Sequence, residues 1–127
     1  MPLYTTRGDN PPAAIAIVTL LSVDGSVHVD DIPMLLDTGA DASVVPLEAV
    51  TRLGLSFLPN RSLEIESYDG TKNKINLVQM SMKFCAKRFR GPFLVLDQPM
   101  GIIGRDVLNR LNLNFNGPLL TWDSLPL

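Results

Sequence analysis

The stretch Met34–Val45 constrains the fold more than any other part of this 127-residue chain. It reads MLLDTGADASVV, so one carboxylate, Asp37, lies between two apolar runs. Residues in such runs are usually buried, and a carboxylate between them is costly to ionise unless hydrogen bonds stabilise it. Thr38 supplies a hydroxyl, and Gly39 allows a backbone N–H to approach the carboxylate closely. The pattern predicts a strand that ends in a tight turn carrying an acid whose pKa is open to tuning.

These residues resemble the aspartic peptidases of the single-domain, retroviral-type (retropepsin-like) branch, in which a hydrophobic-hydrophobic-Asp-Thr-Gly-Ala motif carries the catalytic acid. A second segment, Met100–Leu108, reads MGIIGRDVL and resembles the later Gly-Arg-(Asn/Asp) segment of that family and the helix after it. Two motifs in this order extend the resemblance over residues 13–122. The resemblance implies an all-β, retropepsin-like closed barrel or sandwich of short strands with two short helices. Such a chain corresponds to half of an acid protease and is expected to be homodimeric.

Length and turn signals predict one domain. Residues 1–12 are polar, end in Asn-Pro-Pro and are predicted to be a flexible leader, which leaves residues 13–127 as the folded domain. Strands are predicted where apolar or alternating runs lie between turn signals, at 13–22, 26–36, 62–67, 73–84, 80–86, 92–96, 113–115 and 119–122. Helices are predicted at 46–53 and at 107–111, the second capped by Asp106. The count of short strands independently favours an all-β, barrel-like fold.

Composition excludes several classes of function. A net charge of −2 gives no electrostatic case for nucleic acid. A basic cluster is interpreted as a solvated hairpin end rather than a phosphate-binding patch, and it consists of Lys83, Lys87, Arg88 and Arg90. One cysteine and one histidine are too few ligands for a structural zinc site, so neither metal nor cofactor is expected. Cys85 is interpreted as a buried strand residue and His28 as a solvent-facing one.

The N-terminus has no apolar core typical of a secretory signal. The longest apolar run, residues 13–21, is interrupted by Thr19 and is too short to span a bilayer. The default expectation is a soluble, cytoplasmic protein, and a fragment of a longer polyprotein or membrane-anchored parent is the alternative.

Hydrolysis of a peptide bond by carboxylates needs one group to take a proton from water while another gives one to the carbonyl. The chain has a single Asp-Thr-Gly. The economical solution is a C2 homodimer in which the two Asp37 carboxylates meet on the symmetry axis and share one proton. The predicted function is therefore an aspartic endopeptidase with an acidic to mildly acidic optimum. The alternative is a catalytically weak or inactive retropepsin-like module for dimerisation or peptide binding.

The resemblance assigns the catalytic motif to Asp37, Thr38 and Gly39, with Thr38 hydrogen-bonding across the dimer. Asp41 and Arg105 are either unrelated surface charges or, as the resemblance implies, a partly buried ion pair that braces the active-site loop.

Asp69-Gly70 lies between strand-like runs and predicts a hairpin. It is either one more surface turn or, as the resemblance implies, a flap that closes over an extended polypeptide, with Tyr68 as a wall of the pocket. The residues that the resemblance places against substrate are Leu35, Ala40, Asp41, Ala42, Tyr68, Asp69, Gly70, Met100 and Ile102. Because most of these are apolar, large hydrophobic side chains are expected beside the cleaved bond.

Overall fold

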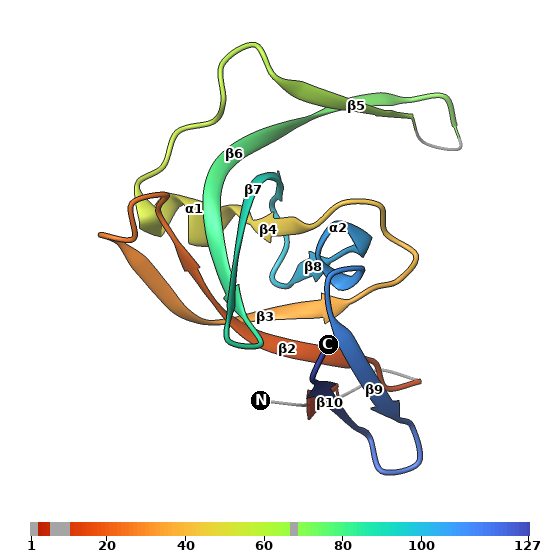
Figure 1. Cartoon of the computed structure of the whole chain (residues 1–127). Coiled ribbons are helices and arrows are strands. Elements are labelled where there is room, and N and C mark those ends of the chain that lie inside the picture. The colour runs from red at the N-terminus through yellow and green to blue at the C-terminus, as the bar shows by residue number, and fades with distance from the viewer. Residues whose placement is uncertain (1–2, 6–10, 67–68) are drawn as a thin grey trace.

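The computed structural model describes residues 3–5, 11–66 and 69–127, and it consists mainly of β-strands (Figure 1). The strands are β1 (Leu3–Tyr4), β2 (Ala14–Leu21), β3 (His28–Leu36), β4 (Val44–Pro46), β5 (Ser62–Glu66), β6 (Lys72–Phe84), β7 (Lys87–Leu96), β8 (Gly101–Ile103), β9 (Asn112–Asn116) and β10 (Thr121–Leu125). The helices are α1 (Leu47–Leu53) and α2 (Arg105–Leu108). The predicted all-β fold with two short helices is confirmed.

Six strands form a closed ring in the order β2, β3, β8, β4, β7 and β6. The ring closes because β2 also pairs with β6, where Thr19 lies opposite Lys83. Strands β3 and β8 are parallel, as are β4 and β7, and the other neighbours are antiparallel. Closure leaves these strands without free edges, so they form a barrel.

The insertion of β8 between β3 and β4 joins two segments that are far apart in the chain. Gly101 begins β8, and a Cβ at this position would lie 2.7 Å from the carbonyl oxygen of Val44 and would also collide with Met34. Only glycine allows this close approach without displacing the neighbouring backbone. The insertion places the end of β3 beside the start of α2.

The main hydrophobic core lies inside the barrel and draws on every strand of the ring. Its fully buried large side chains are Leu20, Met34, Val45, Val50, Val78, Met80, Met82, Phe93 and Ile103. Helix α1 adds Ala49, Val50 and Leu53 to the core, and it ends at Gly54, whose φ of 70° is left-handed. The predicted helix at 46–53 is confirmed, with Pro46 at its N-cap.

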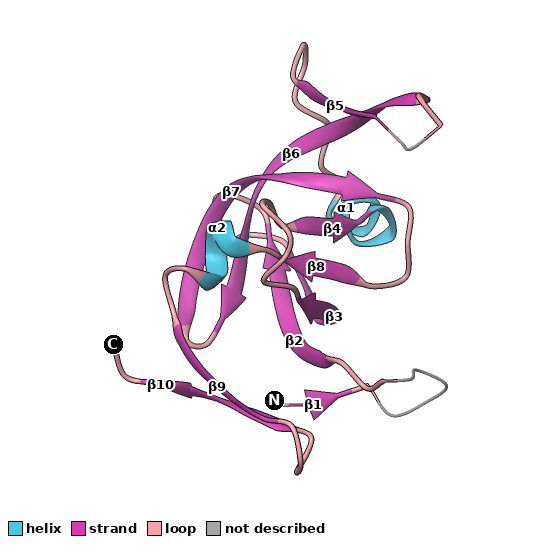
Figure 2. Cartoon of the chain, turned by 90° about the vertical axis from the view of Figure 1, so that its right-hand side faces the viewer, coloured by secondary structure: helices cyan, strands magenta, loops and turns pink. Residues whose placement is uncertain are grey.

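Two hairpins extend from the barrel (Figures 1 and 2). The first part of β6 pairs with β5, and the second part pairs with β7, so the long strand β6 connects the β5–β6 hairpin to the barrel. The β9–β10 hairpin is a separate two-stranded sheet. Trp122 of β10 attaches it to the barrel, because the indole N–H donates to the Ile15 carbonyl at 2.8 Å and the ring packs against Phe84.

Some predicted boundaries are wrong. β6 is continuous to Phe84 and β7 begins at Lys87, so Cys85 belongs to a two-residue turn and not to a strand. Helix α2 covers Arg105–Leu108 instead of residues 107–111, because Gly104 is its N-cap. Two residues of the predicted leader, Leu3–Tyr4, pair with β2 and are not free of the domain. No helix in the described ranges has the length and apolarity required to cross a membrane.

Candidate active site

Asp37 follows directly after β3, and its backbone is held from two sides. Its N–H donates to the carbonyl of Ile103 in β8 at 3.0 Å, and its carbonyl accepts the N–H of Ala40 at 3.2 Å. Its carboxylate Oδ1 accepts the N–H of Gly39 at 2.9 Å. The side chain is half-buried. The strand end and the turn together therefore fix both the position and the orientation of the acid.

Glycine at position 39 leaves room for this arrangement. A Cβ at Gly39 would lie 3.2 Å from Asp37 Oδ1, closer than most side chains tolerate. A Cβ there would require the carboxylate to shift by a few tenths of an ångström. We call residues 37–43, from the acid to the start of β4, the acid loop.

Arg105 at the start of α2 braces the acid loop. Its Nη1 donates to the Thr38 carbonyl at 2.7 Å, its Nη2 donates to Asp41 Oδ1, and its backbone N–H donates to the Ala40 carbonyl at 2.9 Å. The contact with Asp41 forms, but the predicted partial burial is wrong for Asp41, because its side chain is 91 % exposed. An exposed ion pair contributes little by itself. The bonds to the two backbone carbonyls are therefore the main brace.

A second brace was missed by sequence reasoning. Ser43 is 1 % exposed, and its hydroxyl donates to Asp106 Oδ1 at 2.7 Å while accepting the Gly104 N–H at 3.0 Å. The Ser43 N–H donates to Asp106 Oδ2 at 3.0 Å. The prediction that Asp106 caps α2 is therefore wrong, because its carboxylate binds Ser43 and no side chain caps the helix. A serine inside an apolar run was the available signal, since a buried hydroxyl needs a partner.

Gly104 lies where the two segments come closest. A Cβ there would lie 2.8 Å from the carbonyl carbon and oxygen of Ala42 and 2.9 Å from the carbonyl oxygen of Ala40. All three contacts are with backbone, which cannot rotate away. The packing of α2 against the acid loop therefore depends on glycine at this position.

The acid lies at a strand end, a glycine turn follows it, and an arginine braces the loop. The two sequence motifs imply this arrangement. Residues 23–110, more than half of the chain, match the family model described as "gag-polyprotein putative aspartyl protease". The chain belongs to this family of aspartyl proteases.

Two solved structures support the retropepsin-like fold. The protease of EIAV in complex with the inhibitor HBY-793 is 25% identical in sequence, with a TM-score of 0.56, and the match covers 84% of this chain and 92% of that one. A retropepsin-like aspartic protease from Rickettsia conorii has a TM-score of 0.62 at 18% identity, covering 96% of this chain and 87% of that one. The prediction of a retropepsin-like aspartic protease is confirmed at the level of family and fold.

The apolar residues predicted to contact substrate lie around the acid loop of this aspartyl protease. Leu35 in β3 is paired with Ile102 in β8, and both are half-buried. Ala42 and Ile102 pack against a small buried cluster that also includes residues from the base of the β5–β6 hairpin, and its members are Val44, Ile75, Leu77 and Leu94. Met100 is half-buried before β8, and its carbonyl accepts the Gln98 amide at 2.9 Å. Apolar packing thus extends from the acid loop to the base of that hairpin.

The β5–β6 hairpin carries its predicted contact residues at the tip. Asp69 and Gly70 are exposed, and Gly70 has a φ of 83°. Asp69 Oδ1 accepts the Thr71 N–H at 2.9 Å, and the hydroxyl and N–H of Thr71 lower the pKa of Asp69. Tyr68, predicted as a pocket wall, lies outside the described residues. We call residues 62–76 the flap hairpin, after the flap that the sequence predicts there.

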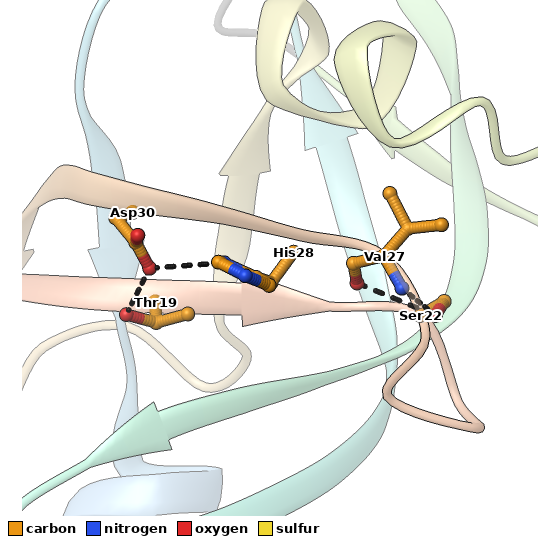
Figure 3. A network of polar contacts seen from close by, with 5 residues as sticks. All are labelled: Thr19, Ser22, Val27, His28 and Asp30. Atoms are coloured by element: carbon orange, nitrogen blue, oxygen red, sulfur yellow. Dashed lines mark hydrogen bonds and ion pairs between the residues drawn. The ribbon is translucent and has the colours of Figure 1, made fainter.

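His28 lies away from the acid loop on the barrel surface. Its Nδ1 is 3.2 Å from Asp30 Oδ1, which also accepts the hydroxyl of Thr19, and Figure 3 shows both contacts beside the Ser22–Val27 hydrogen bonds. The side chain of His28 is 56% exposed, so its predicted solvent-facing position is confirmed. In the described part of the chain, no three side chains of the metal-binding types lie together.

Proposed function

We propose that this protein is an aspartic endopeptidase that acts as a homodimer, with Asp37 from each copy forming its acid pair. One observation carries the proposal: a half-buried carboxylate at the end of β3, oriented by the Gly39 N–H and supported by two braces from the start of α2. Beside it, Thr38, Gly39 and Asp41 are exposed in the single chain. Each chain therefore offers one half of a two-carboxylate site at its surface.

The chemistry follows from the pair. Two carboxylates within about 3 Å of each other share one proton, because both cannot ionise cheaply. The ionised group takes a proton from a water molecule, which attacks the peptide carbonyl, while the protonated group gives its proton to the carbonyl oxygen. The roles then reverse: the proton taken from water passes to the leaving amine as the C–N bond breaks. The acid pair needs no other catalytic group.

The proposed substrate is an extended polypeptide that lies between the acid pair and the flap hairpin. Backbone hydrogen bonds to the hairpin would hold such a chain, and alternate side chains would enter pockets. The half-buried Leu35 and Ile102, together with Ala42, make the neighbouring surface apolar. Large hydrophobic side chains next to the cleaved bond fit this surface best.

The β9–β10 hairpin is the proposed contact with the second copy. An isolated two-stranded sheet is marginally stable in water, and contiguous exposed apolar side chains often mark interfaces. This hairpin, the residues that follow it and β1 carry most of the exposed large apolar side chains of the described chain: Leu3, Phe115, Leu119, Leu120, Leu125 and Leu127. A second copy seated here would remove this apolar area from water and would stabilise the dimer.

The test is cleavage of an unstructured protein such as casein from acidic to neutral pH, with molecular mass tracked in the same samples. Asp37→Asn is expected to lower the rate about 100-fold or more while leaving the dimer intact. Asp31→Asn is the matched control, because Asp31 is an exposed aspartate with a φ of 61°, which asparagine also tolerates.

Two outcomes contradict the proposal. Unchanged cleavage by Asp37→Asn would place the chemistry elsewhere. A folded, dimeric wild type without cleavage at any pH would favour a module that only binds peptides.

A further inference from the structure

Residues 97–100 connect β7 to β8, and we call them the β7–β8 loop (Figure 2). The two strands lie on either side of β4, so the loop crosses one end of that strand. Because β7 runs parallel to β4 and β8 runs antiparallel to it, the crossing is at the Pro46 end, and the acid loop enters β4 at the other end. β4 has three residues, so about 10 Å of strand separates the two loops.

Met100 is the apolar residue of the β7–β8 loop. Gly101 after it faces the core, because a Cβ there would collide with Met34. Side chains alternate along a strand, so Met100 lies on the side of Ile102, which packs with the cluster beside the acid loop. Met100 is half-buried and belongs to neither hydrophobic cluster of the described chain. Its apolar side chain is therefore available to a ligand on the proposed substrate path.

Gln98 holds the β7–β8 loop from within. Its backbone N–H donates to the carbonyl of Leu96, the last residue of β7, at 3.0 Å. Its side-chain amide donates to the carbonyl of Met100 at 2.9 Å, in a partly buried bond. Gln98 itself is half-buried, whereas Asp97 and Pro99 on either side are exposed. One residue therefore bonds backward to β7 and forward to Met100.

The barrel holds the Met100 backbone from the other side. Gly101 lies opposite Met34 in β3, and a Cβ at Gly101 would lie 2.7 Å from the carbonyl oxygen of Val44. The backbone therefore has no room to move further into the barrel, and the Gln98 amide opposes movement away from it. Methionine is flexible and adapts its shape to its neighbours. Its contact with a ligand is well defined only if its backbone is fixed.

We propose that Gln98 is a positioning residue for substrate specificity. Its amide fixes the Met100 carbonyl and so holds the Met100 side chain where it contacts a large apolar side chain next to the cleaved bond. The inference rests on the proposed function and adds to it a residue that acts through Met100 and not by touching the acid.

The loss of this amide has a specific kinetic consequence. A loop without its internal bond has to be ordered each time a large side chain binds. The cost is the same for bound substrate and for the transition state, so it raises KM and leaves kcat unchanged. A substrate with small side chains makes little contact with Met100 and is affected little.

The test uses two peptides copied from the casein segment that the wild type cleaves fastest. They differ only in the two residues flanking the cleaved bond, Leu-Leu in one and Ala-Ala in the other. Gln98→Met keeps the length of the side chain and removes the donor. Its KM for the Leu-Leu peptide is expected to rise about fivefold at unchanged kcat, with kcat/KM for the Ala-Ala peptide unchanged. Gln79→Met is the control, because Gln79 is also half-buried but lies in β6 outside the flap hairpin, and both peptides should behave as with wild type.

Gln98→Glu separates the hydrogen bond from the packing, because a carboxyl group donates only when it is protonated. Below the ordinary glutamate pKa of about 4.3, the new carboxyl can donate to the Met100 carbonyl, and KM for the Leu-Leu peptide is expected to match wild type. Above that pH the donor is lost, and KM should exceed the wild-type value at least as much as in Gln98→Met. The KM ratio of Gln98→Met to wild type should not vary with pH. Asp97 is exposed and common to all variants, so its titration cancels in these ratios.

Three results would overturn the proposal: an unchanged KM in Gln98→Met, an equal fall in kcat/KM for both peptides, or a KM ratio of Gln98→Glu to wild type that is independent of pH. The second of these would assign Gln98 a general structural role. A wild type that cleaves neither casein nor the peptides would instead refute the proposed function, and this inference with it.

Discussion

The acid loop and the flap hairpin lie on either side of the proposed substrate path and are held very differently. The acid loop is bonded to residues 103–106 of a distant segment through backbone, hydroxyl, carboxylate and guanidinium groups. Among the residues that the structure describes, β5 of the flap hairpin pairs only with its neighbour β6. The ion pair between Lys72 and Glu64, at 3.8 Å, is exposed. Long-range bonds fix the acid, whereas the hairpin depends on local pairing.

This difference suits the proposed chemistry. An acid pair works only if both carboxylates are placed within tenths of an ångström, which requires a stiff support. A cover over the substrate has to open and close, and segments with few buried contacts and exposed hydrogen bonds open most easily. Substitutions in the two regions should therefore affect different measurements.

The largest effect is expected from Gly104→Ala. The added Cβ meets backbone atoms of Ala40 and Ala42 within 3 Å, so the acid loop must separate from α2. The free energy of unfolding, measured by urea denaturation, should fall by about 2–3 kcal/mol, and cleavage should be lost with it. Gly117→Ala is the control, because nothing lies within 4 Å of its Cβ. Equal stability of the two variants would show that the acid loop is not tightly held.

Ser43→Ala tests the second brace, the one made by the Ser43 hydroxyl, without adding atoms. It leaves the buried Gly104 N–H without its acceptor and removes one bond from Asp106, so unfolding should become easier by about 2 kcal/mol. Thermal or urea unfolding measures the loss, and Ser43→Thr, which keeps the hydroxyl, should restore part of it. The exposed Ser56→Ala serves as the control. A Ser43→Ala protein as stable as the Ser56→Ala protein would contradict the role of this brace.

Gly70→Ala tests the flap hairpin. Alanine strains the tip at a φ of 83°, by about 1 kcal/mol, although no atom lies within 4 Å. Because the hairpin opens locally, the unfolding midpoint should barely change, whereas kcat/KM should fall about fivefold and amide exchange in residues 62–76 should become faster. A loss of global stability as large as that of Gly104→Ala would remove the distinction between the two regions.

The smallest expected effect is on the pH dependence of stability, and it concerns two Asp-Gly turns. One turn is fixed to the barrel, and the other lies at the tip of the flap hairpin. The N–H and hydroxyl of Ser26, with the Ser22 hydroxyl, lower the pKa of Asp24 to about 2. Because this value is below the unfolded pKa of about 4, the ionised Asp24 stabilises the protein above pH 4, and that contribution disappears as the pH falls towards 2.

Asp24→Asn should therefore lose less unfolding free energy than wild type between pH 4 and pH 2. Asp69 also has a lowered pKa, but it lies on the locally opening hairpin, so Asp69→Asn should follow the wild-type curve. Urea denaturation at a series of pH values measures both. Identical curves for the two variants would mean that the turns are coupled equally to global unfolding.

Local sequence patterns predicted the parts of the fold that are determined by interactions between residues close together in the chain. The Asp-Gly turns, the helix beginning after Pro46 and the strand that ends just before Asp37 each depend on neighbours in the chain. The turn at Cys85-Ala86 escaped prediction because neither residue is a typical former of a left-handed turn.

The remaining features depend on contacts between distant segments. The position of β8 between β3 and β4 and the bond from Ser43 to Asp106, 63 positions later, follow from how the barrel closes. Sequence reasoning therefore identified the acid and its arginine, but not the serine and the aspartate that complete their support.

Subunit mixing tests the central claim, that one active site needs Asp37 from two copies. Wild type and Asp37→Asn are allowed to exchange subunits in equal amounts, and cleavage is compared with an all-wild-type sample at the same total concentration. If every mixed dimer lacks a working acid pair, about one quarter of the activity remains, because only wild-type pairs are active. A remaining activity of about one half would show that each copy acts through its own carboxylate and would contradict the shared site.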